Sequence, residues 1–285
     1  MTLKLCAFAD EAASSINEQV SALKRNAISL VELRSIDGIN ISNISEEQAK
    51  RYADYFTQEG IEVWSIGSPL GKIKIDGDFE EHLELTNHII KLAKIFGTDR
   101  VRMFSFFLTD NDLHRETVIS RLNQMNDIAI QNGIQFYNEN EKDLYCDLAK
   151  YSKDVLDNVK GIKSIFDPAN YIQCGQDIKE AMDMLIDRTD YFHIKDAIMG
   201  SGEVVPAGFG DGKLDEMIKR IKTDTILSIE PHLKVFSGLS EIDNHELKNK
   251  FAYKSNNDAF DAAVQAIKTL LINNGYSESN GLWIK

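Results

Sequence analysis

Short apolar runs alternate along this chain with longer segments in which apolar residues recur every three or four positions. The first such pair is an apolar run at residues 3–10, followed by a helical pattern at residues 14–26. Residues 45–60 form the clearest predicted helix, because Ser45 and Gln48 have the spacing of a capping box. The alternation of strand-like and helix-like segments indicates an α/β protein.

The same alternation repeats eight times. The predicted strands cover residues 3–10, 29–34, 62–69, 100–107, 134–140, 163–168, 190–197 and 225–231. The predicted helices cover residues 14–26, 45–60, 82–97, 115–133, 147–159, 177–189, 214–222 and 257–275. Eight strand–helix units are what a (β/α)8 TIM barrel requires, so we expect one such domain over residues 1–285. An open doubly wound sheet is the alternative, and it is disfavoured because no glycine-rich phosphate loop follows the first strand.

One segment departs from the alternation of predicted strands and helices. Residues 232–256 follow the last predicted strand and show no regular period. A loop of this length inside a compact domain is usually a lid or a binding element. We therefore expect residues 232–256 to form a lid or insert at the barrel.

Composition excludes several classes of function. Asp and Glu number 45 against 32 Lys and Arg, a net charge of −13, which disfavours nucleic acid as a partner. No run approaches the roughly 20 apolar residues that span a bilayer, and Asp10 and Glu11 interrupt the first apolar run too early for a signal peptide. The three cysteines are far apart and odd in number, which fits no disulfide framework. We expect a cytoplasmic protein that does not bind membranes.

Four consecutive predicted strands carry charged or imidazole side chains at their carboxyl ends. These residues are Glu139, Asp167, His193 and Glu230. In a parallel barrel the carboxyl ends of the strands surround one site, so these four side chains are expected to converge. Each residue alone has a structural alternative, because a strand-end aspartate often caps a helix and a histidine beside aromatic residues often belongs to the core.

Three carboxylates and one imidazole at close range repel one another unless a cation lies among them. Oxygen-rich ligands with one histidine suit Mn²⁺, Mg²⁺ or Co²⁺, and Zn²⁺ less specifically. The sequence therefore predicts one divalent metal ion at the carboxyl end of the barrel.

At these same positions the chain resembles a known superfamily. The segments YNENE, FDPANY, HIKDA and IEPH, in this order and spacing, are similar to the xylose isomerase-like sugar isomerases and epimerases. The segments VELR, SPLGKI and VRMFSFF are similar to its sugar phosphate isomerase/epimerase branch, and the resemblance covers roughly residues 3 to 275. It implies that the four residues hold one divalent cation and that Glu139 and Glu230 act as acid and base.

The resemblance implies a metal-dependent isomerase or epimerase of carbohydrate metabolism, acting on a sugar or a sugar phosphate. The cation would stabilise the enediolate that forms when a carboxylate removes the α-proton. Asn170 stands where the ketose 3-epimerases of the superfamily have a histidine that contacts substrate, so their substrate specificity does not carry over. Because members often form dimers or tetramers, the resemblance also suggests a homo-oligomer.

Further residues are candidates for binding the substrate. They are Lys72, Asn170, Lys195, Asp196 and His232. Lys72 is placed to bind a phosphate or carboxylate, with a solvated loop lysine as the alternative. Asp196 has the alternative of capping the loop that follows it.

Three other functions compete with the isomerase. A lyase resembling the inosose dehydratases would expel water from the same enediolate. A barrel that binds a sugar without turnover would lack a ligand or a base. A nuclease resembling the AP endonucleases would need several histidines, whereas His82, His88 and His114 are predicted on or beside helices.

Overall fold

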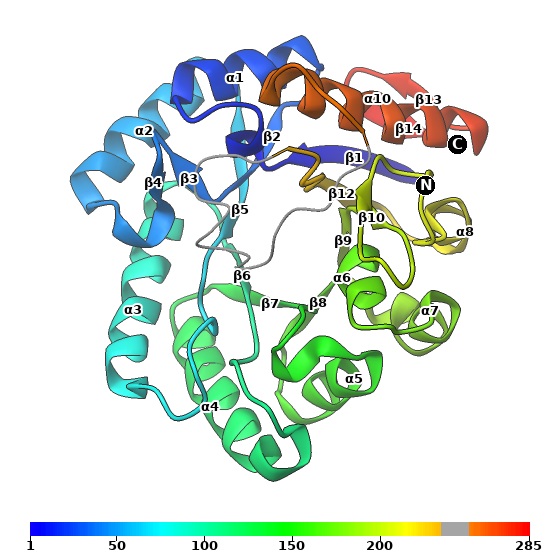
Figure 1. Ribbon diagram of the computed structural model, residues 1–285. Coiled ribbons are helices and arrows are strands. Elements are labelled where there is room, and N and C mark those ends of the chain that lie inside the picture. The colour runs from blue at the N-terminus through cyan, green and yellow to red at the C-terminus, as the bar shows by residue number, and fades with distance from the viewer. Residues whose placement is uncertain (235–250) are drawn as a thin grey trace.

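Eight parallel strands close into a barrel in the computed structural model, which describes residues 1–234 and 251–285 (Figure 1). In order around the barrel they are β1 (Thr2–Ala7), β2 (Leu30–Leu33), β5 (Glu62–Gly67), β6 (Arg100–Met103), β7 (Gln135–Glu139), β8 (Lys163–Phe166), β9 (Tyr191–Ile194) and β12 (Thr225–Ile229). The barrel closes because β12 pairs in parallel with β1, with Leu5 opposite Leu227. The predicted single-domain TIM barrel is confirmed.

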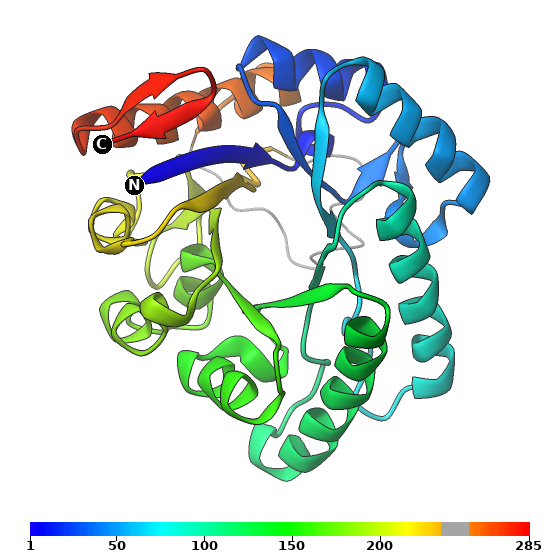
Figure 2. The same cartoon turned by 180° about the vertical axis from the view of Figure 1, so that it is seen from behind.

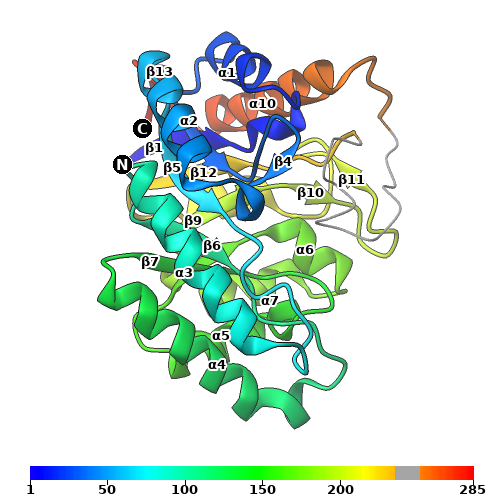
Figure 3. The ribbon, with the colours of Figure 1, turned by 90° about the vertical axis from the view of Figure 1, so that its left-hand side faces the viewer.

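Helices surround the barrel on the outside (Figures 1 and 3). They are α1 (Ile16–Arg25), α2 (Glu46–Gln58), α3 (Phe79–Ile95), α4 (Asn111–Gln131), α5 (Ala149–Asn158), α6 (Pro168–Gln173), α7 (Ile178–Leu185), α8 (Leu214–Arg220) and α10 (Asn256–Asn273). The predicted capping box is present at α2, where Ser45 and Gln48 exchange side-chain and backbone hydrogen bonds. Short α6 was not predicted.

The C-terminal end adds a hairpin that the sequence analysis did not predict. Strands β13 (Ser277–Ser279) and β14 (Leu282–Ile284) pair with each other, and β14 pairs antiparallel with β1. The turn uses Asn280 and Gly281, both with positive φ, as two-residue hairpin turns require. Figure 2 shows the result, in which both termini lie together beside the barrel.

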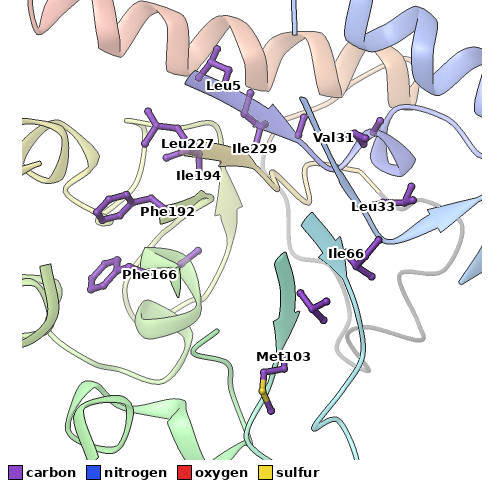
Figure 4. Close-up of a cluster of buried hydrophobic side chains, with 14 of the residues drawn as sticks. Leu5, Val31, Leu33, Ile66, Met103, Phe166, Phe192, Ile194, Leu227 and Ile229 are labelled. Carbon is purple, nitrogen blue, oxygen red and sulfur yellow. The ribbon is translucent and has the colours of Figure 1, made fainter. Parts of the chain in front are cut away.

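Alternate residues of each strand point to opposite faces, and this period organises the core. The outward residues form the large apolar layer between the strands and the helices; Figure 4 shows members such as Leu5, Phe166 and Phe192. The inward residues near the start of the strands form a small second cluster that includes Cys6 and Tyr191. This inner cluster packs across the interior of the barrel. In TIM barrels the active site lies at the carboxyl ends of the strands.

The predictions of a lid and of no membrane-spanning segment can be compared only with the described residues. The centre of the expected lid, residues 235–250, lies outside them. Within residues 1–234 and 251–285, none of the helices combines the length and the apolar character that crossing a membrane requires.

The loop after β5 depends on a glycine at position 71. Gly71 has a φ of +84°, and a Cβ there would lie 2.0 Å from the carbonyl oxygen of Phe104. We expect Gly71→Ala to lower the free energy of unfolding by more than about 3 kcal/mol, because both the backbone and the contact resist the methyl group. The control is Gly60→Ala, since Gly60 has a similar φ of +71° and no atom within 4 Å of the added Cβ. Urea unfolding that gives equal losses for both variants would contradict the steric argument.

Candidate metal centre

Inward-facing residues near the carboxyl ends of the strands form a charged layer above the apolar base. On β9, Tyr191 faces inward, and the alternation brings His193 to the same side. On β12 the same alternation places Ile226, Ser228 and Glu230, which directly follows the strand, on the inward side. His193 lies opposite Ser228 in the register of β9 and β12, and the carboxyl ends of barrel strands surround one site, so these polar side chains gather there.

The four side chains expected to bind metal converge in the structure. Ligand atoms of Glu139, Asp167, His193 and Glu230 all lie within 4.8 Å of one another, and all four residues are buried. The Nδ1 atom of His193 is 2.8 Å from Oε1 of Glu139 and 3.2 Å from Oε2 of Glu230. These two inner carboxylate oxygens therefore share one centre with the imidazole.

Asp167 fulfils both functions that the sequence left open. Its Oδ1 accepts the backbone N–H of Asn170 at 3.0 Å and so caps α6. Its Oδ2 is directed into the cluster, 2.9 Å from Nζ of Lys195. Capping α6 thus fixes the carboxylate with one oxygen held by the helix and the other available at the site.

His193 is oriented by a carboxylate from across the barrel. Its Nε2 lies 3.2 Å from Oε2 of Glu32, on β2, and that glutamate also accepts hydrogen bonds from Tyr191 and Ser228. With Nε2 donating its proton to Glu32, the lone pair of Nδ1 would be available to a cation held beside Glu139 and Glu230. A carboxylate behind a histidine is the usual arrangement that sets the tautomer of a metal ligand.

We expect Glu32→Gln to weaken Mn²⁺ binding about 10- to 100-fold, because the amide no longer compels His193 to present Nδ1 as a lone pair. The dissociation constant is measured by competition with a chromogenic chelator. Glu62→Gln is the control, since Glu62 is an exposed glutamate at the start of a barrel strand. Equal affinity in wild type and Glu32→Gln would show that Glu32 does not orient the histidine.

Two buried arginines hold the outer carboxylate oxygens. Nη1 of Arg34 lies 2.7 Å from Oε1 of Glu230, and the same guanidinium binds Asp10 through two hydrogen bonds of 2.8 and 3.0 Å. Nη1 of Arg102 lies 3.2 Å from Oε2 of Glu139 and 3.4 Å from Oε1 of Glu230. Each glutamate therefore has one oxygen fixed by arginine and the other facing the cluster.

The electrostatics of the cluster fit a divalent cation. Burial raises the pKa of Asp167 to about 7, Lys195 opposes that rise, and Glu139 and Glu230 add to it. Burial lowers the pKa of His193, yet the carboxylates of Glu139 and Glu32 hold it well above the usual value. Oδ2 of Asp167 and Oε2 of Glu230 have ion-pair contacts, to Lys195 at 2.9 Å and to His193 at 3.2 Å, but neither accepts a hydrogen bond of good geometry within the described part of the chain. Buried carboxylate oxygens of this kind beside an imidazole are ligands for a hard or borderline cation.

Three of the expected substrate-binding residues lie against the cluster. The side-chain amide of Asn170 donates to Oε1 of Glu139 at 3.3 Å. Nζ of Lys195 lies 3.6 Å from Oε2 of Glu230. Nε2 of His232 is 3.6 Å from Oε1 of Glu230, and burial lowers its pKa to about 4, so the imidazole is neutral.

The other two expected residues are placed differently. Lys72 lies beside the cluster and pairs with Glu141, 2.8 Å from its Oε2. Asp196 faces away from it: its carboxylate accepts backbone N–H groups of Ala197, Gly208, Gly210 and Gly212. Asp196 therefore caps the loop that follows it, which was its alternative assignment. Side chains alternate along a strand, so Asp196 faces the side opposite to its inward-facing neighbour Lys195.

Sequence reasoning missed the arginines and the full importance of Glu32. In the structure Oε1 of Glu11 lies 3.3 Å from Nη2 of Arg34, and Glu32 lies against His193. Sequence reasoning did not select Arg102. The available signal was the alternation itself, which places Arg102 on the inward side of β6, level with Tyr137 on β7.

Comparison with known proteins identifies the family of this fold. A family model described as "Xylose isomerase-like TIM barrel" matches residues 20–253. No curated protein matches the chain in sequence. Among solved structures, an L-ribulose 3-epimerase superposes with a TM-score of 0.74 at 16% identity, covering 95% of each chain.

Two further solved structures are similar to the chain, and their names state a dehydratase and a bound zinc atom. A probable 3-DHS dehydratase involved in petrobactin synthesis in Bacillus anthracis has a TM-score of 0.71 and 17% identity, covering 93% of this chain and 98% of its own. The IOLI protein with a bound zinc atom has a TM-score of 0.72 and 14% identity, covering 94% of this chain and 97% of its own. At these identities the similarity establishes the fold.

Proposed function

The chain belongs to the xylose isomerase-like TIM barrel family, and from that premise we propose that it is a divalent-metal-dependent enzyme that moves protons on a small carbohydrate, as an isomerase or epimerase. The proposed metal ligands are Glu139, Asp167, His193 and Glu230. Similar folds with names that state an epimerase, a dehydratase and a bound zinc atom support this class of chemistry without selecting one reaction.

The observation that carries the proposal is the paired placement of Glu139 and Glu230. They come from β7 and from the end of β12, with β8 and β9 between them, so they approach a bound molecule from different sides. Burial raises the pKa of Glu139, but His193 and Arg102 hold it below the usual value. Burial also raises the pKa of Glu230, but Lys195 and His193 lower it by more, so it lies well below the usual value. Both carboxylates are therefore ionised and able to accept a proton.

Proton transfer then follows from the positions of the two glutamates. A bound divalent cation supplies Lewis acidity that stabilises negative charge on a substrate oxygen. One glutamate removes the proton from the carbon next to the carbonyl group. If the other glutamate first takes up a proton from water, it can deliver that proton to the opposite face of the carbon, which inverts the configuration. If the first glutamate instead returns its proton to the neighbouring carbon, ketose and aldose interconvert.

Solvent exchange tests the proposal. The Mn²⁺-loaded protein is incubated in D₂O with a panel of ketopentoses, ketohexoses and their phosphate esters, and the products are analysed by NMR and mass spectrometry. Deuterium at the carbon next to the carbonyl of at least one ketose, at constant heavy-atom composition, is the expected result. A product lighter by one water would assign the chain to the lyases, and no exchange with any member of the panel would contradict proton transfer on ketoses.

A further inference from the structure

Four cationic side chains lie around the inner end of the barrel mouth, and each contacts a carboxylate of the same chain. The cations are Arg34, Lys72, Arg102 and Lys195. Their partners and the other acidic side chains of the mouth are Asp10, Glu11, Glu32, Glu139, Glu141, Asp167 and Glu230. From this pattern we propose that the site accepts an uncharged polyhydroxy ketone and rejects phosphate esters, an inference that rests on the proposed function.

The pair between Lys72 and Glu141 is the strongest evidence. Lys72 is the residue whose position favours a substrate phosphate or carboxylate, yet its ammonium lies 2.8 Å from Oε2 of Glu141. It also lies 4.4 Å from the centre of the Phe104 ring. The side chains of Lys72 and Glu141 are only 8% and 19% exposed, so the pair is held in place rather than solvated. An acidic side chain of the protein thus occupies the position that a substrate anion would need.

The charge balance of the mouth gives the same answer. Each of the four cations is already paired with a carboxylate of the chain, so a phosphate group would have to displace a carboxylate to reach any of them. A phosphate ester would add about two more negative charges to a poorly solvated site, where repulsion between like charges is strong. Hydroxyl groups carry no such cost, because each donates a hydrogen bond to a carboxylate oxygen.

Chain-wide charge acts in the same direction. The net charge of −13 lowers the local concentration of anionic metabolites at the surface, whereas neutral sugars are unaffected. Phosphate esters are therefore disfavoured twice, first by the charge of the whole chain and then at the pair of Lys72 and Glu141.

Ligand affinity tests this inference separately from catalysis. Isothermal titration of the Mg²⁺-loaded protein compares D-ribulose and D-fructose with their phosphate monoesters. Three proteins are compared: wild type, Glu141→Gln, which leaves the Lys72 ammonium without its carboxylate, and Glu46→Gln. Glu46 is the matched control because it forms an exposed pair with Lys91 at 3.7 Å between the outer helices α2 and α3, and its substitution changes the net charge equally.

We expect wild type to bind a neutral ketose at least tenfold more tightly than its phosphate ester. We expect Glu141→Gln to bind the ester about tenfold more tightly than wild type does, with no change in Glu46→Gln. Tighter binding of the ester by wild type, or equal gains in both variants, would overturn the inference. If neutral ketoses bind with this selectivity but exchange no deuterium, the proposed function fails while the substrate class stands.

Discussion

Replacing Glu139 by Gln is expected to lower turnover of any exchanging ketose by about a thousandfold. The amide retains the size of the carboxylate but accepts no proton, and loss of a general base typically costs 100- to 10,000-fold. Oε1 of Glu139 is 2.8 Å from Nδ1 of His193, so the same substitution also removes one of the proposed metal ligands. Turnover and metal content are therefore measured on the same preparation.

Two outcomes of that experiment separate the functions of Glu139. If metal is retained and deuterium exchange is lost, Glu139 acts as a base; if both are lost, its first function is to bind the cation. Glu84→Gln is the control, because Glu84 is an exposed glutamate of α3. Full activity of Glu139→Gln at normal metal content would remove Glu139 from the mechanism.

Replacing Arg34 by Met is expected to lower the free energy of unfolding by about 3–5 kcal/mol, the usual result of breaking a buried ion pair from one side. Only 1% of the Arg34 side chain is exposed, and it contacts Asp10, Glu11 and Glu230. Methionine fills much of the volume over the Phe8 ring but leaves Asp10 and Glu11 without the arginine, while Glu230 keeps its contacts with Arg102 and Lys195. The midpoint of urea unfolding measures the loss.

The chain provides a control and a rescue for this substitution. Arg25 pairs with Asp261 at 2.9 Å, but the two side chains are 43% and 39% exposed, so Arg25→Met should cost less than about 1 kcal/mol. Adding Asp10→Asn to Arg34→Met should restore part of the stability, because one uncompensated charge is removed. Similar losses for Arg25→Met and Arg34→Met would mean that the buried pairs do not stabilise the barrel.

The fold was predictable because the hydrophobic period of each segment agrees with its final surroundings. The barrel strands are buried on both faces and their outward residues pack against amphipathic helices, which is the pattern that the sequence displays. The hairpin of β13 and β14 escaped prediction for a different reason. Its Asn280–Gly281 turn is recognisable, but its pairing with β1 exists only once the barrel has brought the two ends together.

The candidate site was predictable in part. Its four proposed ligands end four consecutive strands, a regularity that sequence shows directly. The arginines that hold them act across the barrel: Arg34 and Glu230 are separated by 196 residues, and only closure of β12 onto β1 makes them neighbours. Asp196 was assigned to the substrate although strand alternation already places it opposite to Lys195. Direction of the side chain, not residue type, decided that case.

The central claim is that Glu139, Asp167, His193 and Glu230 hold one divalent cation. The most direct test is to incubate the purified protein with Mn²⁺, desalt it, and measure bound metal by mass spectrometry beside a His193→Ala, Glu230→Ala double variant. About one ion per chain is expected in the wild type and almost none in a double variant that remains folded by circular dichroism. No stoichiometric metal in the wild type, or equal metal in both proteins, would contradict a metal centre at these four residues.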